Sequence, residues 1–213
     1  MKHTRESVKD AHYSGLEVSM ALSEAGLAAQ PHHLYALKPT VRFSQYWAMP
    51  NKDTFTIKPI GELVARYVNA GGIWIDPMAG NNSPAQITND MNPDTSAKHH
   101  MDAKTFLDKM VTHFDGVLFD PPYSPRQVSE MYNGFGGKAT SWDTTMSYYS
   151  KLKDAIVPLI NIGGHAISFG WNSNGFGKGR GFETVEIMLV KHGGWHNDTI
   201  VTVEKKTHNI RKI

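Results

Sequence analysis

The tetrapeptide Asp120-Pro121-Pro122-Tyr123 directly follows an apolar run, Val117-Leu118-Phe119, and is the strongest chemical signal in the sequence. Two consecutive prolines fix φ, remove two backbone donors and prevent a strand from continuing. Their carbonyl oxygens remain available as acceptors. The sequence therefore predicts a stiff loop that presents one carboxylate, backbone carbonyls and an aromatic ring.

A loop of this kind suits the activation of an aromatic amine. The exocyclic amine of adenine or cytosine is a poor nucleophile because its lone pair is delocalised into the ring. If Asp120 and the Pro121 carbonyl accept both amine protons, the nitrogen moves toward sp³ geometry and its lone pair becomes exposed. Tyr123 could stack on the base, an interaction of about 1–3 kcal/mol, and such positioning lowers a barrier by several kcal/mol. The simpler alternative is a rigid turn with a buried tyrosine.

Three further carboxylates are expected near this loop, because ligands of an open parallel sheet bind beyond the carboxyl ends of its strands. Asp76 and Asp90 end two other candidate strands, and Asp102 follows the short run 99–101, a candidate for one more. Four carboxylates are thus predicted on one rim. Taken singly, each could instead start a turn or cap a helix.

The elements that must position these residues alternate between strand and helix. Short apolar runs predict buried strands, and longer amphipathic segments predict helices; the strands are at 73–76, 86–90, 117–120 and 165–170, and the helices at 60–69, 103–113 and 144–160. This alternation favours a Rossmann-like, doubly wound α/β fold with a mostly parallel sheet.

Both ends of the chain differ from this pattern. The β-rich runs 183–191 and 198–205 flank a Gly-Gly pair, which predicts an antiparallel C-terminal hairpin closing one edge of the sheet. Residues 1–40 are predicted to be mostly helical, so we divide the chain into a helical extension, 1–40, and one domain, 41–213. The run 21–27 faintly suggests a DNA-reading helix-turn-helix, but a helix that ends at Gly26 is the commoner meaning.

Composition excludes several classes of protein. No apolar run approaches the roughly 20 residues that span a bilayer, and the N-terminal residues lack the apolar stretch of a secretory signal, so a cytoplasmic location without a membrane partner is expected. The absence of cysteine excludes disulfides, iron–sulfur clusters and thiol nucleophiles. The net charge of +2 neither favours nor excludes a nucleic-acid partner. No metal is expected, because Gly193 and Gly194 separate His192 from His196 and favour a turn.

Two motifs resemble a known family. Asp-Pro-Pro-Tyr is the catalytic motif of the S-adenosylmethionine-dependent amino-methyltransferases that make N6-methyladenine or N4-methylcytosine in DNA. The segment 76–82, Asp-Pro-Met-Ala-Gly-Asn-Asn, is similar to the family's first motif, Asp-Pro-Phe-x-Gly-x-Gly. The segment 53–60 resembles a further cofactor motif that precedes the first strand. The resemblance covers roughly residues 50–205 and is most specific at 120–123.

The resemblance implies S-adenosylmethionine as the cofactor and gives roles to individual residues. Gly80 would let the backbone approach the cofactor while Asp76 faces its methionine part. Asp90 would accept the ribose hydroxyls, and Asp102-Ala103 matches the place where a carboxylate reads the adenine amine. The cofactor-binding residues implied in this way are Phe55, Asp76, Pro77, Met78, Ala79, Gly80, Asn81, Asp90, Asp102, Ala103 and Asp120.

The sequence departs from the family in three places. Asn82 replaces the last glycine of the first motif. The stretch between Asp76 and Asp90 is too short for the usual helix, and Pro84 supports its reduction to a turn. No large insertion is present that could recognise a target, which leaves the loops 124–143 and 172–182.

These two loops carry basic and aromatic residues among glycines. Lys138, Lys178 and Arg180 are predicted to meet nucleic-acid phosphates, which would give salt-dependent affinity without sequence information. The alternative is a pair of flexible surface loops with ordinary solubilising charge.

The function predicted from these residues is methyl transfer to the exocyclic amine of a base in DNA. Adenine N6 is favoured because Asp-Pro-Pro-Tyr is more typical of the adenine enzymes. Two alternatives stay open. The first is an RNA methyltransferase acting on guanine N2 or adenine N6, and the second is a catalytically silent module that binds DNA or a partner. The sequence makes no prediction of oligomeric state.

Overall fold

The computed structural model describes residues 40–122 and 146–209. By compactness the chain divides into two units, Met1–Lys38 and Pro39–Ile213, and all the described residues belong to the second. Apart from Thr40, the predicted helical segment 1–40 lies outside the described residues. Within the described residues, no helix is long and apolar enough to cross a bilayer.

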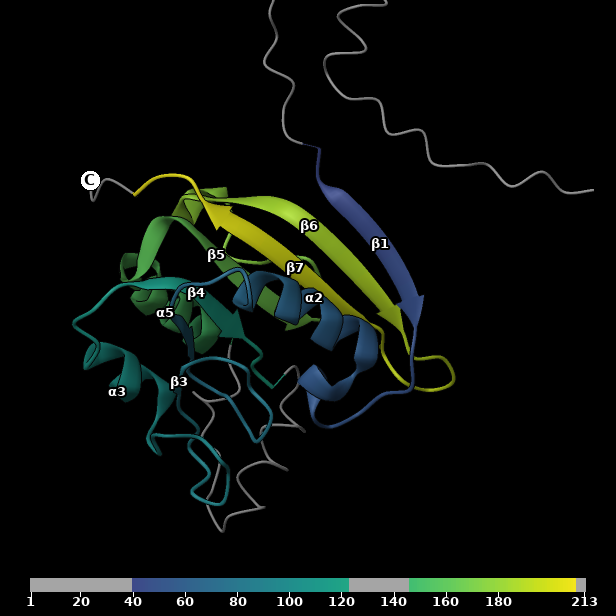
Figure 1. Ribbon diagram of the computed structural model, residues 1–213, viewed down its shortest axis with the longest axis horizontal. Coiled ribbons are helices and arrows are strands. Elements are labelled where there is room, and N and C mark those ends of the chain that lie inside the picture. The colour runs from purple at the N-terminus through teal and green to yellow at the C-terminus, as the bar shows by residue number, and fades with distance from the viewer. Residues whose placement is uncertain (1–39, 123–145, 210–213) are drawn as a thin grey trace, which may run out of the picture. The chain divides into compact units, whose positions relative to one another are not determined.

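One seven-stranded sheet organises the second unit, with the strand order β1-β6-β7-β5-β4-β2-β3 (Figure 1). Every neighbouring pair is parallel except those made by β7, which runs antiparallel to both β5 and β6. The strands are β1 Arg42–Trp47, β2 Trp74–Asp76, β3 Ile87–Thr88, β4 Phe114–Phe119, β5 Ile160–Gly170, β6 Phe182–Lys191 and β7 Thr199–Lys206. The prediction of a doubly wound α/β fold with a mostly parallel sheet is confirmed.

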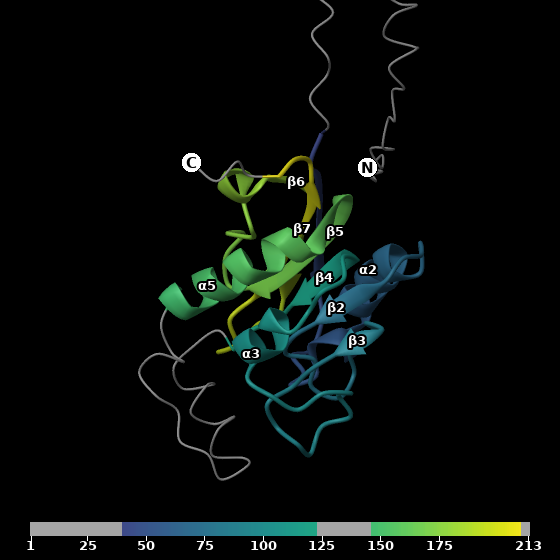
Figure 2. The ribbon, with the colours of Figure 1, turned by 90° about the vertical axis from the view of Figure 1, so that its left-hand side faces the viewer.

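Helices cover both faces of the sheet (Figure 2). On one face, α2 (Lys58–Val68) buries an apolar stripe with helical spacing, made of Ile60, Leu63, Val64 and Val68. On the other face, α3 (Ala103–Asp108) and α5 (Met146–Ile156) form a second core with β2, β4 and β5. Three short 3-10 helices complete the described part of the unit: η1 Thr54–Thr56, η2 Val157–Leu159 and η3 Lys178–Arg180.

Two predicted helices are shorter than expected. The helix expected at 103–113 ends at Asp108, because the chain must turn before Phe114 begins β4. The helix expected at 144–160 stops at Ile156, since Pro158 cannot continue it, and Ile160 already belongs to β5. Between β2 and β3 the chain forms turns and no helix, as the short spacing predicted.

The C-terminal hairpin is confirmed, but its predicted place in the sheet is wrong. β6 and β7 pair antiparallel, yet β7 lies inside the sheet beside β5, and the edge is formed by β1, which pairs with β6. β1 was not predicted, because its sequence Arg-Phe-Ser-Gln-Tyr-Trp has neither a continuous apolar run nor an alternation of apolar and polar residues.

Candidate functional site

Three of the four predicted carboxylates lie close together at the carboxyl edge of the sheet. Burial raises the pKa of Asp76 to about 7; hydrogen bonds from Ser83 and Met78 oppose this rise, and the neighbouring Asp120 and Asp90 carboxylates add to it. These electrostatic interactions require that the ends of β2, β3 and β4 bring the three side chains within range of one another. The expectation of a shared acidic rim is met for these three residues.

Asp76 organises the loop that follows β2. Its side chain is fully buried. One carboxylate oxygen accepts a hydrogen bond from Met78 N (3.0 Å), and the other accepts one from Ser83 Oγ (2.7 Å). The resemblance implied that Asp76 faces the methionine part of the cofactor, but its carboxylate is turned into the loop, because two local donors hold it there. Its role in this structure is to shape the turn.

Gly80 gives this loop an open surface. It has a φ of +54°, a left-handed conformation that glycine adopts without strain. A Cβ added at this position would meet nothing within 4 Å, so the space in front of it is open. Its N–H donates to Asp90 Oδ2 (2.9 Å), and Asp90 Oδ1 accepts from Asn92 N (2.9 Å). Each Asp90 oxygen has a second lone pair, with which it could accept a ligand hydroxyl.

The remaining residues of the first motif are hydrogen-bonded to other segments of the chain, mostly through their backbone groups. Asn89 Nδ2 donates to the Pro77 carbonyl (3.0 Å) and to the Met101 carbonyl (2.9 Å), and Ala79 N donates to the Asn89 carbonyl (2.8 Å). The Asn81 side chain accepts from Ser96 N (2.9 Å). The loop is therefore preformed, because bonds from other segments of the chain hold its turns.

Asp102 is tied to two helices. It caps the N-terminus of α3, where its Oδ1 accepts from Thr105 N (2.9 Å), and its Oδ2 accepts from Tyr148 Oη on α5 (2.7 Å). Burial acts to raise the pKa of Asp102, but the hydrogen bonds from Tyr148 and Thr105 outweigh it and lower the pKa. Ala103 is buried at the start of α3. Asp102 Oδ2 has a second lone pair, with which it could accept a hydrogen bond from a ligand.

The proline loop after β4 borders a small cavity of about 130 Å³. Pro121 and Pro122 form one part of its wall, and residues 168–172 at the end of β5 form another. Ser168 Oγ is buried and has no hydrogen-bond partner among the described residues, so it is a polar group that a ligand could satisfy. Tyr123 of the motif lies outside the described residues.

Lys153 of α5 forms a further part of the cavity wall. Its Nζ donates to the carbonyls of Asn174 (2.9 Å) and Gly175 (2.7 Å). It also lies over the rings of Phe119 and Phe176, 5.5 and 5.6 Å from their centroids. Burial lowers the pKa of Lys153, Arg180 lowers it further, and Glu204 opposes both.

Glu204 holds the same loop through a second set of bonds. Its carboxylate accepts hydrogen bonds from Phe176 N and from Gly177 N. A Cβ at Gly175 would overlap this carboxylate, so a larger residue there would displace it. The segment 174–177 is thereby held between a half-buried lysine, Lys153, and a buried glutamate, Glu204.

Phe55 approaches the cavity from the opposite face of the sheet. Its ring packs edge-to-face on Phe169, with centroids 5.4 Å apart, and Phe169 lines the cavity. The predicted cofactor motif at 53–60 is thus brought to the end of β5, behind the cavity wall.

The predicted phosphate-binding residues differ in whether their side chains are exposed or already bonded to other residues. Lys178 is exposed at the start of η3, whereas Lys138 lies outside the described residues. Arg180 is already occupied: its Nε pairs with Asp154 Oδ1 (2.7 Å) and its Nη2 donates to Ser150 Oγ (2.7 Å), both on α5. Arg180 therefore holds its loop against α5, and this geometry does not favour the phosphate contact predicted for it.

Sequence reasoning missed most of the residues that line the cavity, and four of them show why. Tyr149 and Lys153 come from α5, and Ser168 and Trp171 come from the end of β5. The rule that ligands bind beyond strand ends could have identified Ser168 and Trp171. Nothing in the sequence marks Lys153, because its burial depends on how α5 packs.

Comparisons with known proteins give similarity in structure only. Neither a protein-family model nor a curated protein sequence matches the chain. TrmN from Thermus thermophilus is 16% identical with a TM-score of 0.48, over 70% of this chain and 49% of TrmN. NSun6 from Pyrococcus horikoshii is 12% identical with a TM-score of 0.46, over 69% of this chain and 51% of NSun6. The N-methyltransferase NodS from Bradyrhizobium japonicum WM9 is 10% identical with a TM-score of 0.46, over 71% of this chain and 96% of NodS. This chain matches about half the length of TrmN and NSun6.

Proposed function

We propose that the chain transfers a methyl group from S-adenosylmethionine to the exocyclic amine of a nucleic-acid base, adenine N6 in DNA being the favoured target. One observation carries the proposal. The stiff loop after Phe119 ends a central strand, Pro121 and Pro122 in it border a small cavity, and its Asp120 carboxylate interacts electrostatically with Asp76 at the end of β2. This arrangement supports a role for the Asp120 carboxylate and the Pro121 carbonyl in holding the amine.

The residues around Gly80 fit the cofactor. The open space in front of Gly80 would admit it, Asp90 would accept ribose hydroxyls, and Asp102 would accept the adenine amine through Oδ2. When bound, S-adenosylmethionine supplies an electrophilic methyl group on a positively charged sulfur.

The chain's own contribution to the reaction is to orient and activate the amine. The Asp120 carboxylate and the Pro121 carbonyl accept hydrogen bonds from its two N–H groups, which localises the nitrogen lone pair. Pro121 and Pro122 keep these acceptors in place because their φ angles are fixed. The cavity of about 130 Å³ is far smaller than the roughly 300–1,000 Å³ of pockets for drug-sized ligands. Its size therefore suits a single ring system.

The choice of DNA over RNA follows the resemblance of the tetrapeptide to the DNA adenine enzymes. A base in a duplex must be flipped out of its stack, at a cost of a few kcal/mol. An RNA loop, whose bases are already unstacked, does not carry this cost. The absence of a large recognition insertion in the sequence favours RNA as the second candidate.

The test is to incubate the full chain with isotope-labelled cofactor and, separately, duplex DNA, single-stranded DNA and RNA, followed by mass spectrometry of the nucleosides. We expect labelled N6-methyladenine from DNA. Label in RNA alone would move the substrate to the second candidate, and label in neither would refute the proposal.

A pair of variants tests the role of Asp120. Asp120→Ala should lower transfer by at least about 100-fold, the scale of a lost acid–base contact, while calorimetry should find S-adenosylmethionine binding largely intact. The matched control is Asp108→Ala on the exposed face of α3, where Asp108 pairs with Lys104. Undiminished transfer by Asp120→Ala would contradict the assignment.

A further inference from the structure

Within the part of the chain that the structure describes, the outer edge of β1 is a row of unpaired backbone groups. β1 pairs with β6 on one side only and is the last strand of the sheet. Ala48 N donates to Lys191 O (3.1 Å), so in this parallel ladder the even-numbered residues turn their backbone groups toward β6. Successive residues of a strand alternate, so the N–H and C=O groups of Phe43, Gln45 and Trp47 point outward. These are the positions at which another strand could add.

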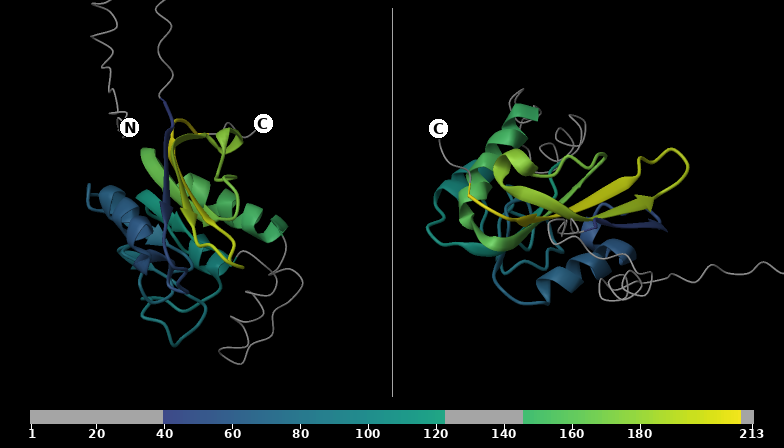
Figure 3. Two further views of the ribbon diagram at one scale, coloured as in Figure 1. Left: turned by 90° about the vertical axis from the view of Figure 1, so that its right-hand side faces the viewer. Right: turned by 90° about the horizontal axis from the view of Figure 1, so that it is seen from above.

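The side chains of the same three residues share one face of the sheet, and that face is open. Phe43 is 67% exposed and Trp47 is 64% exposed. Figure 3 shows α2 on one side of β1, β6 and β7; on their other side, among the described residues, α5 reaches the start of β6, where Phe182 is buried with Leu152 and Ile156. Further along β6, Ile187 and Leu189, which pair with β1, are only half-buried.

β1 carries only one of the devices that usually protect an edge strand, an inward-turned charge at its first residue, Arg42. Proteins block such edges with lysine, proline or a bulge. Within Arg42–Trp47 there is no lysine or proline, and the pairing with β6 runs without a register shift. The single charged residue, Arg42, is turned inward, where its Nη2 pairs with Glu186 (3.0 Å) and donates to Tyr67 Oη (2.9 Å).

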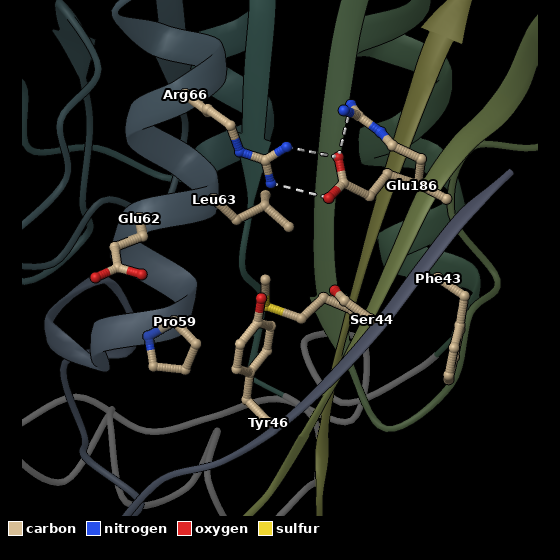
Figure 4. Close-up of a pocket in the computed structure, with 10 residues that line it drawn as sticks. Phe43, Ser44, Tyr46, Pro59, Glu62, Leu63, Arg66 and Glu186 are labelled. Atoms are coloured by element: carbon tan, nitrogen blue, oxygen red, sulfur yellow. Dashed lines mark hydrogen bonds and ion pairs between the residues drawn. The ribbon is translucent and has the colours of Figure 1, made fainter. Parts of the chain in front are cut away.

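The side of β1 that faces α2 is a cavity of about 500 Å³ (Figure 4). Arg42, Phe43, Ser44 and Tyr46 border it from β1, and Arg66 and Leu63 line it from α2. Phe43 extends from β1 on the other side of the strand, as the alternation requires (Figure 4).

The end of β1 is held in place by the β6–β7 loop. His192 is buried; its Nδ1 donates to the Ala48 carbonyl (2.8 Å), and its Nε2 is 2.9 Å from Thr199 Oγ1. A Cβ at Gly193 would lie 3.3 Å from Trp47 Nε1, so the indole sits close against this loop. The edge is therefore ordered before any partner arrives, which reduces the entropic cost of pairing.

We propose that β1 is a dimerisation strand, which pairs antiparallel with β1 of a second copy of this chain about a two-fold axis at Gln45. This register makes hydrogen-bonded pairs of all the outward residues at once. Gln45 faces Gln45 of the second copy, and Phe43 faces Trp47 of the second copy at both ends. Moving the axis by one residue in either direction separates Phe43 from Trp47, so neither ring keeps its aromatic partner.

The chemistry of the strand fits this self-pairing. Each cross-strand Phe43–Trp47 pair joins two exposed aromatic rings on the same face, an arrangement that stabilises paired strands. No like charges are opposed, because Arg42 faces Ala48 of the second copy. An isologous contact of this kind closes after two copies, so it protects the edge without forming fibres. Such pairing does not depend on the proposed function.

The first test is the mass of the full chain in solution. Sedimentation velocity between about 1 and 100 μM, the range in which modest interfaces dissociate, should give a dimer of twice 23.7 kDa. A chain that remains monomeric throughout this range overturns the proposal.

Gln45→Pro tests the strand pairing itself. Proline removes the outward N–H at the two-fold axis in both copies but leaves the bonds to β6, which come from even-numbered residues, and edge strands tolerate it there. Loss of two hydrogen bonds should raise the dimer dissociation constant by about tenfold or more. Gln45→Thr keeps the N–H and should leave it unchanged. A Gln45→Pro dimer as tight as that of the parent would contradict the pairing.

A cross-linking experiment fixes the register without relying on a proline. The chain has no cysteine, so Gln45→Cys introduces a single thiol, which the two-fold axis would bring to about 5.5 Å (Cα–Cα) from its copy. A short bis-maleimide should then give mostly covalent dimer. The control is Val111→Cys, a 97% exposed position between α3 and β4. Equal cross-linking of the two variants would overturn the proposed register.

Discussion

Two buried carboxylates, Asp76 at the end of β2 and Glu186 in β6, are held in opposite ways. Asp76 accepts from neutral donors, Met78 N and Ser83 Oγ, and burial raises its pKa to about 7. For Glu186, burial also acts to raise the pKa, but Arg66, Tyr67 and Arg42 outweigh it and lower the pKa. Burial makes a carboxylate costly to ionise, and neighbouring cations reverse this.

The contrast extends to the two halves of the sheet around them. The half around Asp76 has short strands; β2 is buried at all three of its residues, and the loops that carry the candidate site follow these strands. The half around Glu186 has longer strands, and its edge strand β1 is exposed at five of its six residues. We infer that the buried half positions the candidate site, whereas the open half offers a surface to partners.

The largest difference should come from replacing one tryptophan in each half. Trp74 is 1% exposed, and a Cβ on Gly116 would already overlap its ring, so the packing around it is tight. Trp74→Ala should lower the free energy of unfolding by about 3–5 kcal/mol. Trp47→Ala should change it by less than about 0.5 kcal/mol in the monomer. Urea denaturation measures both, and similar losses would remove the distinction between the halves.

The next effect is the pH dependence caused by Asp76. The folded pKa of about 7 lies above the ordinary value of 3.8, so the folded state binds the proton more tightly than the unfolded state. The contribution of this group to stability is therefore fully present below about pH 4 and is lost as the pH rises to about 7. The gap between the two values limits the loss to about 4 kcal/mol. Asp76→Asn should abolish this pH dependence of the free energy of unfolding, which denaturation curves measured at several pH values would show. A variant whose free energy of unfolding changes with pH as that of the parent does would refute the prediction.

Glu186 should produce a smaller effect of opposite sign. Its folded pKa is lowered, so its contribution is present above the ordinary pKa of a glutamate and is lost as the pH falls through the folded pKa. Glu186→Gln should cost about 1–3 kcal/mol at pH 7, the value of hydrogen bonds to a charged group. The difference from the parent should shrink in acid. Glu62→Gln, an exposed control on α2, should have little effect at either pH.

The sequence was sufficient for the features that depend on local pattern. The apolar runs placed β2, β3, β4 and β5, and the short spacing between Asp76 and Asp90 predicted that no helix separates β2 from β3. β1 was missed because an exposed edge strand has no buried face to impose an alternation. Its place beside β6 depends on a long-range pairing that no local pattern encodes.

The candidate site was predictable as a set of positions but not as a set of contacts. The rule that ligands bind beyond the carboxyl ends of parallel strands correctly predicted that Asp76, Asp90 and Asp120 lie near one another. It could not predict that Asp76 turns inward to Ser83 or that Arg180 pairs with Asp154. These contacts depend on which side chains the tertiary structure brings within hydrogen-bonding distance of each other.

The turns between β2 and β3 have a consequence for how this protein would discriminate among small molecules. A helix at this place would direct a partial charge of about +0.5 from its N-terminus toward an anionic group. Here residues 77–86 provide turns instead, and the N–H groups of Met78 and Gly80 are already engaged by carboxylates. An amino-acid tail would find weak electrostatic anchorage in such a loop. If S-adenosylmethionine is the cofactor, as we propose, its discrimination from related molecules would then rest on contacts to its ribose and its adenine.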